Sequence, residues 1–216
     1  MFEQTNKLKN YSKLLEGLYE SFVGPVLEGK QKGTPLFEWE SPPPFFGSDI
    51  LSRCDYNTYK LINESGLKIS PANDAIALSY SNYEPAIAYL NEIIDTLGKQ
   101  VGVDNLGLSN KPLCYEKYKD YNGFMGWHTN HDYPGDRWYF VYNTDSESSF
   151  FRCIDPDTKQ MITEWEPKGW SLNHFTVGDS HKPLWHCVYT KSSRISFGIR
   201  SLPSLGSHKW KNVILM

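Results

Sequence analysis

The sequence predicts a mainly β fold with flanking α-helices, on three observations. First, 14 tyrosines, 11 phenylalanines and 7 tryptophans make 15% of 216 residues aromatic, which is typical of β-sheets and ligand pockets. Second, six short runs rich in aromatic and β-branched residues follow Pro112. Third, residues that favour tight turns separate these runs. Such spacing indicates a sandwich or a double-sheet barrel, with helices against one face. The runs are Trp138–Tyr142, Phe150–Ile154, Gln160–Trp165, Ser171–Val177, Leu184–Tyr189 and Arg194–Ile199.

Two segments in the first half have the apolar spacing of helices. Over Lys7–Phe22, leucines and aromatic residues recur at three- and four-residue steps, which places them on one helical face. Over Glu84–Val101, the apolar residues again share one face. The glycines and prolines between Gly24 and Gly47 predict loops. We expect the Pro42–Pro44 loop, together with a loop over Tyr133–Arg137, to cover the substrate site.

Length and composition limit the class of protein. A net charge of −3 provides no overall basic field for duplex nucleic acid. The sequence has no export signal and no run of about 18 apolar residues that would span a membrane. We therefore expect a cytoplasmic protein with packed, unpaired cysteines. We expect one domain over residues 1–216, with helical and loop support and outer strands at 1–110, the β core at 111–200 and a tail at 201–216.

The β-rich half contains histidines and an arginine in an order that suits metal and carboxylate binding. On an extended strand, His128 and Asn130 project to the same side. A second run contains His186, and Arg194 and Ser196 share one face of the next run. Imidazoles with a carboxylate bind non-haem Fe(II), and a buried arginine binds a carboxylate through paired hydrogen bonds. The pattern predicts an iron site beside an anion site.

Three segments resemble the Fe(II)/2-oxoglutarate-dependent oxygenase family. They are Gly126-Trp-His128-Thr-Asn130, Leu184-Trp-His186-Cys-Val188 and Arg194-Ile-Ser196-Phe-Gly-Ile-Arg200, and the resemblance covers roughly residues 113–200. It implies a double-stranded β-helix, or jelly roll, buttressed by helices. It also implies Fe(II) as cofactor, with 2-oxoglutarate and O₂ as cosubstrates.

The resemblance assigns a role to each matching residue. His128 and His186 correspond to catalytic iron ligands, and Arg194 and Ser196 to residues that bind 2-oxoglutarate. Tyr118, ahead of Tyr115, is the counterpart of a tyrosine that also contacts 2-oxoglutarate. Arg200 has the spacing of the second arginine in the nucleic-acid-demethylating branch, although that branch has asparagine where this sequence has Ser196.

The sequence departs from the family at Asn130, where the motif has aspartate or glutamate. A neutral amide is a poorer Fe(II) ligand than a carboxylate. Asp132 supplies the carboxylate if the chain turns sharply after His128. Alternatively, the Asn130 oxygen or His131 binds the metal, or the site retains two histidines and admits an exogenous anion.

The resemblance implies an oxygenase that oxidises, and in the simplest case hydroxylates, a small molecule, an amino acid or peptide, or a nucleotide. The alternative is a jelly-roll protein that binds a ligand without turnover, because Asn130 replaces the carboxylate. A metal-dependent isomerase or epimerase on a cupin-like barrel is a third class. We expect a monomer or homodimer without a membrane partner.

Overall fold

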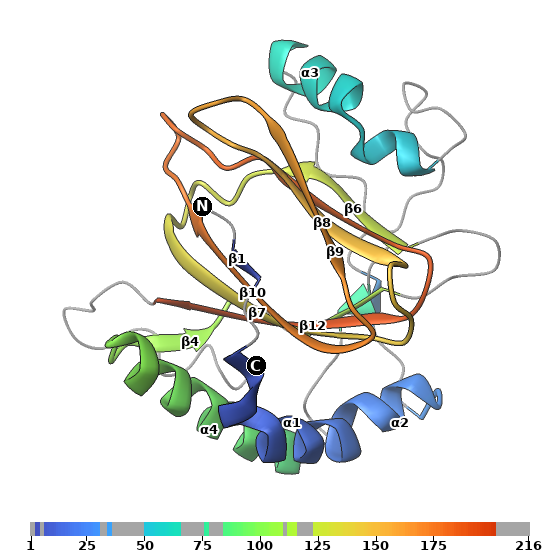
Figure 1. The fold of residues 1–216 in the computed structure, drawn as a ribbon, viewed down its shortest axis with the longest axis vertical. Coiled ribbons are helices and arrows are strands. Elements are labelled where there is room, and N and C mark those ends of the chain that lie inside the picture. The colour runs from blue at the N-terminus through green and yellow to red at the C-terminus, as the bar shows by residue number, and fades with distance from the viewer. Residues whose placement is uncertain are drawn as a thin grey trace.

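The computed structural model describes residues 3–4, 7–30, 34–35, 50–65, 76–77, 84–109, 112–115 and 123–201. Within these residues, strands form two antiparallel sheets of eight and four strands, and helices lie outside them (Figure 1). No helix in the described ranges is long and apolar enough to cross a membrane.

The larger sheet is built mainly from long strands of the second half of the chain. Its order is β1-β10-β7-β12-β5-β3-β2, and β4 also pairs with β12. Its strands are β1 (Glu3–Gln4), β2 (Thr34–Pro35), β3 (Ile76–Ala77), β4 (Leu106–Leu108), β5 (Leu113–Tyr115), β7 (Gly135–Asn143), β10 (Gly169–Val177) and β12 (Arg194–Ser201).

The smaller sheet has the order β6-β11-β8-β9. Its strands are β6 (Gly123–His128), β8 (Ser149–Ile154), β9 (Met161–Glu166) and β11 (His186–Thr190). From β5 to β12, the chain passes repeatedly between the two sheets. Residues far apart in the sequence therefore meet in the space between them.

Side chains of β7 and β12 alternate between two environments, as period-two strands require. On one face, Trp138, Phe140 and Phe197 join the core formed with the N-terminal helices. On the other face, Tyr139 packs with residues of the smaller sheet. Arg137 has the same parity as Tyr139 and therefore points between the sheets.

Helices cover the outer face of the larger sheet (Figure 1). A continuous helical run contains the 3₁₀ turn η1 (Lys7–Tyr11), α1 (Ser12–Leu18), the π turn η2 (Tyr19–Val23) and α2 (Gly24–Leu27). Helix α4 (Glu84–Val101) lies beside α1. The hydroxyl of Tyr11 donates a hydrogen bond of 2.8 Å to Gln100, which ties the first turn to the end of α4.

A shorter helical unit covers the outer face of the smaller sheet. It consists of the 3₁₀ turn η3 (Ile50–Cys54) and α3 (Tyr56–Ser65). Trp127 donates its indole N–H to the carbonyl of Asp55 at 2.9 Å. The ring of Tyr59 packs 5.5 Å from Trp127 and 6.0 Å from Trp185. Both tryptophans thus anchor this helical unit.

The expected elements are largely present. The helix expected over Lys7–Phe22 continues to Leu27, and the helix over Glu84–Val101 has those bounds. Each of the six expected strands is present, with ends shifted by up to three residues. The loop expected from Gly24 onward is wrong for Gly24–Leu27, where Pro25 lies in the first turn of α2 and its fixed φ suits a helix. Pro42–Pro44 lies outside the described residues.

Candidate metal centre

His128 and His186 meet at the edge of the smaller sheet. His128 is the last residue of β6, His186 is the first residue of β11, and the two are direct cross-strand partners. Their ring centroids lie 4.1 Å apart with planes inclined at 56°. The pairing register shifts between His186 and Val188, so a local irregularity in the strand accompanies the pair.

Backbone carbonyls fix the tautomer of both imidazoles. Nδ1 of His128 lies 2.8 Å from the carbonyl oxygen of Gly126, and Nδ1 of His186 lies 2.9 Å from that of Leu184. A carbonyl oxygen only accepts hydrogen bonds, so each Nδ1 is the protonated nitrogen. Each Nε2 therefore carries the lone pair, as in histidines that bind metals.

Burial keeps both imidazoles neutral. It lowers the pKa of His128, although the hydrogen bond to Gly126 partly opposes the shift. Burial also lowers the pKa of His186 well below its usual value, and the neighbouring His128 and Arg137 lower it further. Metal ions bind the neutral form of imidazole, so neither histidine must lose a proton at pH 7 before it binds one.

Asn130 lies beside the histidine pair in the position where the family motif has a carboxylate. Its Nδ2 is 3.1 Å from Nε2 of His186, so the amide donates to the lone pair that a metal would use. A half-turn of the amide would direct Oδ1, a neutral oxygen ligand, toward the same point. The side chain thus caps the pair without a metal and offers a third ligand with one.

The structure does not bring Asp132 or His131 to the pair. The Asp132 side chain is 82% exposed, and its carboxylate lies 3.6 Å from Nε2 of His131. His131 also lies close to the hydroxyl of Thr129, in the exposed turn after β6. Among the described residues, no three His, Cys, Asp or Glu side chains form a metal-binding group. A carboxylate from Asp132 is therefore absent from this arrangement.

Aromatic rings line one side of His186. The ring centroids of Phe151 and Phe175 lie 5.6 and 5.4 Å from its imidazole. Phe151 belongs to the smaller sheet and Phe175 to the larger one, so this apolar wall lies between the sheets. It limits access of water to the histidine pair.

Arg194 lies in a second polar cluster, at the other end of β12. Its Nε and Nη2 each donate to a different oxygen of Glu166, both at 2.7 Å, and the arginine is 2% exposed. Ser149 and Asn173 also donate to the Glu166 carboxylate, at 2.7 and 2.8 Å. The guanidinium expected to bind the carboxylate of 2-oxoglutarate thus binds a carboxylate of the protein itself.

The structure describes only some of the other residues that were expected to contact 2-oxoglutarate. Ser196 is buried on the same strand, two residues after Arg194. The backbone of Tyr115 pairs with Arg194 across β5 and β12. Tyr118 lies outside the described residues.

Arg137 and Arg200 are charged residues close to the histidine pair that the sequence alone did not bring together. Arg137 is 3% exposed. Arg200 is its direct partner across β7 and β12. The available signal was the alternation along Arg194–Arg200, which places both arginines of that segment on one face of a strand.

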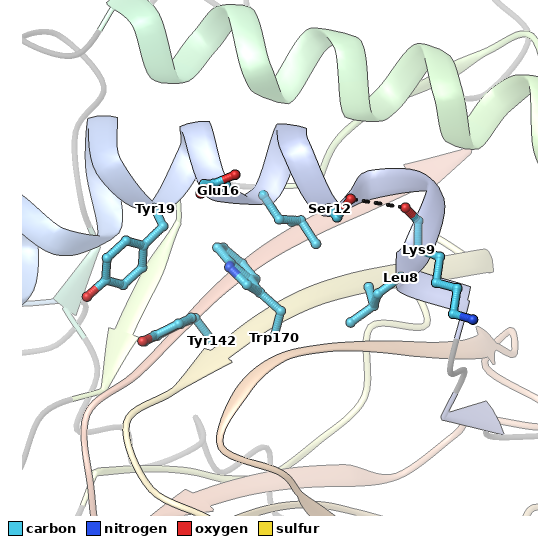
Figure 2. Close-up of a pocket in the computed structure, with 8 residues that line it drawn as sticks. Leu8, Lys9, Ser12, Glu16, Tyr19, Tyr142 and Trp170 are labelled. Atoms are coloured by element: carbon cyan, nitrogen blue, oxygen red, sulfur yellow. Dashed lines mark hydrogen bonds between the residues drawn. The ribbon is translucent and has the colours of Figure 1, made fainter.

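A separate groove lies between η1, α1 and the larger sheet, with a volume of about 590 Å³ (Figure 2). Tyr142 and Trp170 line it from the sheet, and Leu8, Lys9, Ser12, Leu15, Glu16 and Tyr19 line it from the helical side. Tyr142 belongs to the helix-facing side of β7. The groove is therefore on the opposite face of this sheet from the histidines.

The sequence matches no protein-family model and no curated protein. Among solved structures, the fold is similar to "Oxidoreductase, 2OG-Fe(II) oxygenase family" from Burkholderia pseudomallei, with a TM-score of 0.40 and 10% sequence identity. The match covers 69% of this chain and 80% of that chain.

Proposed function

We propose that this chain is a jelly-roll oxygenase that holds Fe(II) with His128, His186 and Asn130 and oxidises a small molecule, a peptide or a nucleotide. The observation that carries the proposal is the histidine pair, with two neutral imidazoles whose backbone hydrogen bonds leave both Nε2 atoms available at one place. Buried neutral imidazoles are suited to a transition metal such as Fe(II).

The strand order supports the jelly-roll part of the proposal. The segment β10-β7-β12-β5 faces β6-β11-β8-β9, and the chain crosses repeatedly between these two sets. Two facing four-stranded sets with such crossings are the arrangement of a jelly roll. The histidines come from adjacent strands of one set and face the space between the sheets.

The residues present fit an iron ion better than they fit 2-oxoglutarate. Bound iron would supply the oxidising chemistry, while the imidazoles hold it and Phe151 and Phe175 exclude water. Glu166, however, occupies the face of Arg194 that the distal carboxylate of 2-oxoglutarate would need. Binding of 2-oxoglutarate at Arg194 therefore requires Glu166 to leave, which would separate a buried ion pair.

A second function follows from the same two departures from the oxygenase pattern. With Asn130 beside the histidines and Glu166 on Arg194, the chain would bind a metal and a ligand without turning over 2-oxoglutarate. This alternative is a binding protein that has the fold and the histidine pair of an oxygenase.

Two spectroscopic titrations under anaerobic conditions separate these functions. We expect Co(II) to bind with visible absorption in the wild type and in His181→Ala, which alters an exposed histidine, but not in His186→Ala. Failure of Co(II) to bind the wild type would contradict the metal site. Fe(II) with 2-oxoglutarate should then produce a charge-transfer band if the protein is an oxygenase. Co(II) binding without that band would favour the binding protein.

A further inference from the structure

A buried arginine and a half-buried arginine face each other next to the candidate metal centre. Arg137 and Arg200 are direct cross-strand partners, and strand parity directs both side chains between the sheets. Arg137 is 3% exposed, and Nε of Arg200 is buried without a hydrogen-bond partner. Like charges opposite each other destabilise a sheet, and the burial of Arg137 removes much of the water that would screen them. The pair is therefore unfavourable unless an anion joins it.

No acidic side chain of the described residues pairs with either arginine. Arg137 donates to the backbone carbonyls of Tyr133 and Asp136, and the guanidinium of Arg200 lies 4.7 Å from the centre of the Tyr133 ring. The carboxylate of Asp136 accepts a hydrogen bond of 2.7 Å from Thr176, and it lies 3.2 Å from Nε2 of His174. The acid next to Arg137 in the sequence is thus engaged on the other face of the sheet.

The pKa of Arg137 is consistent with a buried cation that lies opposite a second cation. Burial lowers the pKa of Arg137, and the positive charge of Arg200 lowers it further, although Tyr139 and Asp136 partly oppose the shift. A cation whose charged form is disfavoured in this way gains more from a bound anion than an exposed lysine does.

A short chain of contacts links the arginine pair to the histidines. Arg137 is the cross-strand partner of Phe175, whose ring lies 5.4 Å from the imidazole of His186. Arg137 is also close enough to His186 to lower the pKa of that imidazole. A ligand that reached the two guanidinium groups would therefore extend past the histidine pair.

We propose that Arg137 and Arg200 form a binding site for an oxyanion, a carboxylate or phosphate group of a ligand that also reaches the candidate metal centre. The proposal rests on the proposed function for the nature of that centre, whereas anion binding itself needs no metal. It assigns the anion to this pair and leaves Arg194 with Glu166. Planar guanidinium groups suit both oxyanions because they donate paired hydrogen bonds.

Isothermal titration calorimetry on the full chain in EDTA tests the site without the metal. The probes are 2-oxoglutarate, succinate and inorganic phosphate, so the experiment distinguishes a carboxylate site from a phosphate site. We expect at least one probe to bind the wild type, and Arg200→Gln to weaken that binding about tenfold or more, since a charged hydrogen bond is lost. Lys168→Gln removes the same charge from an exposed turn and should leave the affinity unchanged.

Thermal unfolding provides the second measurement. Without an anion, Arg200→Gln should be at least as stable as the wild type, because the substitution relieves the repulsion that Arg200 exerts on the buried cation Arg137. The anion that binds should raise the unfolding temperature of the wild type more than that of the variant. The proposal is overturned if none of the three anions binds the wild type, or if Arg200→Gln binds as tightly. Loss of Co(II) binding alone would contradict the metal centre but not this site.

Discussion

Glu166 has a buried charge that is held by residues from several strands. Arg194 binds both carboxylate oxygens, and Ser149 and Asn173 each donate one further hydrogen bond. Burial alone would raise the pKa of Glu166, but Arg194 and these hydrogen bonds lower it below its usual value. The carboxylate therefore remains ionised and links both sheets at this end of the molecule.

Glu166→Gln should lower the free energy of unfolding by about 3–5 kcal/mol, because it leaves the buried Arg194 without its counter-charge. Urea denaturation at pH 7 measures the change. The matched control is Asp157→Asn, which breaks an exposed pair with Lys182 and should cost less than about 1 kcal/mol. Equal losses in the two variants would show that the buried pair contributes no more than a surface pair.

The histidine pair predicts a pH dependence of the metal-free protein. Their pKa values lie below the usual 6.5 in the folded state, so the unfolded chain takes up protons first as the pH falls. The free energy of unfolding should therefore be constant above about pH 6.5 and decrease below it. His186→Gln should show a smaller decrease between about pH 6.5 and 5, measured by urea denaturation in EDTA. An unchanged pH profile would contradict the assignment of a buried neutral imidazole.

At the scale of elements, the turn between β6 and β7 joins the two candidate sites. Asn130 lies near its start, and the carbonyl of Asn130 accepts a hydrogen bond of 3.0 Å from the N–H of Tyr133. Tyr133 then contacts Arg137 through its carbonyl and Arg200 through its ring. Gly135 ends the turn with a φ of +123°, a conformation that residues with a Cβ rarely adopt.

Gly135→Ala should displace this turn, because a Cβ would be strained at that φ and would lie 3.2 Å from the hydroxyl of Ser201. We expect a loss of about 1–3 kcal/mol in stability and weaker binding of both Co(II) and the anion. Gly29→Ala is the control, since Gly29 also has a positive φ, of 71°, but lies at the end of α2 with open space around it. Calorimetry should show normal binding in that variant. If both variants bind Co(II) and the anion equally well, the turn does not position either site.

At the scale of the whole molecule, the space between the sheets has two chemically different ends. The histidine and arginine pairs lie at one end, and the Glu166–Arg194 cluster lies at the other. Arg137 and Asn143, which mark these ends on β7, are six residues apart, or about 20 Å along an extended strand. Among the described residues, the nitrogen groups at the first end have no acidic partner and suit ligands, whereas the other end is closed by internal pairing.

A metal that binds the folded chain should stabilise it as a whole. Co(II) at about 100 times its dissociation constant should add about 2.7 kcal/mol to the free energy of unfolding. The shift should be absent in His128→Ala and present in His181→Ala, which alters an exposed histidine. Differential scanning calorimetry measures it. A shift that persists in His128→Ala would place the metal elsewhere.

Elements with strong periodicity were predictable from the sequence. The apolar face of α4 is long enough for its period to identify it, and aromatic and β-branched residues between turn signals identify β7, β10 and β12. Helix α3 was not predicted, because its ten residues include only two buried apolar positions, Tyr59 and Ile62. Its position depends on contacts with Trp127 and Trp185, which are distant in the sequence.

Local sequence determined where strands and helices form and which side chains share a face, because backbone periodicity acts over a few residues. It therefore brought out His128, Asn130 and His186 as one group. Only the tertiary structure decided what each charge meets, since ionic partners come from distant strands. It paired Arg194 with Glu166, 28 residues away, and set Arg200 opposite Arg137 with no acid from the described part of the chain between them. The energy of a buried charge depends on these neighbours, so the sequence order of the charges did not reveal which arginine can take a ligand.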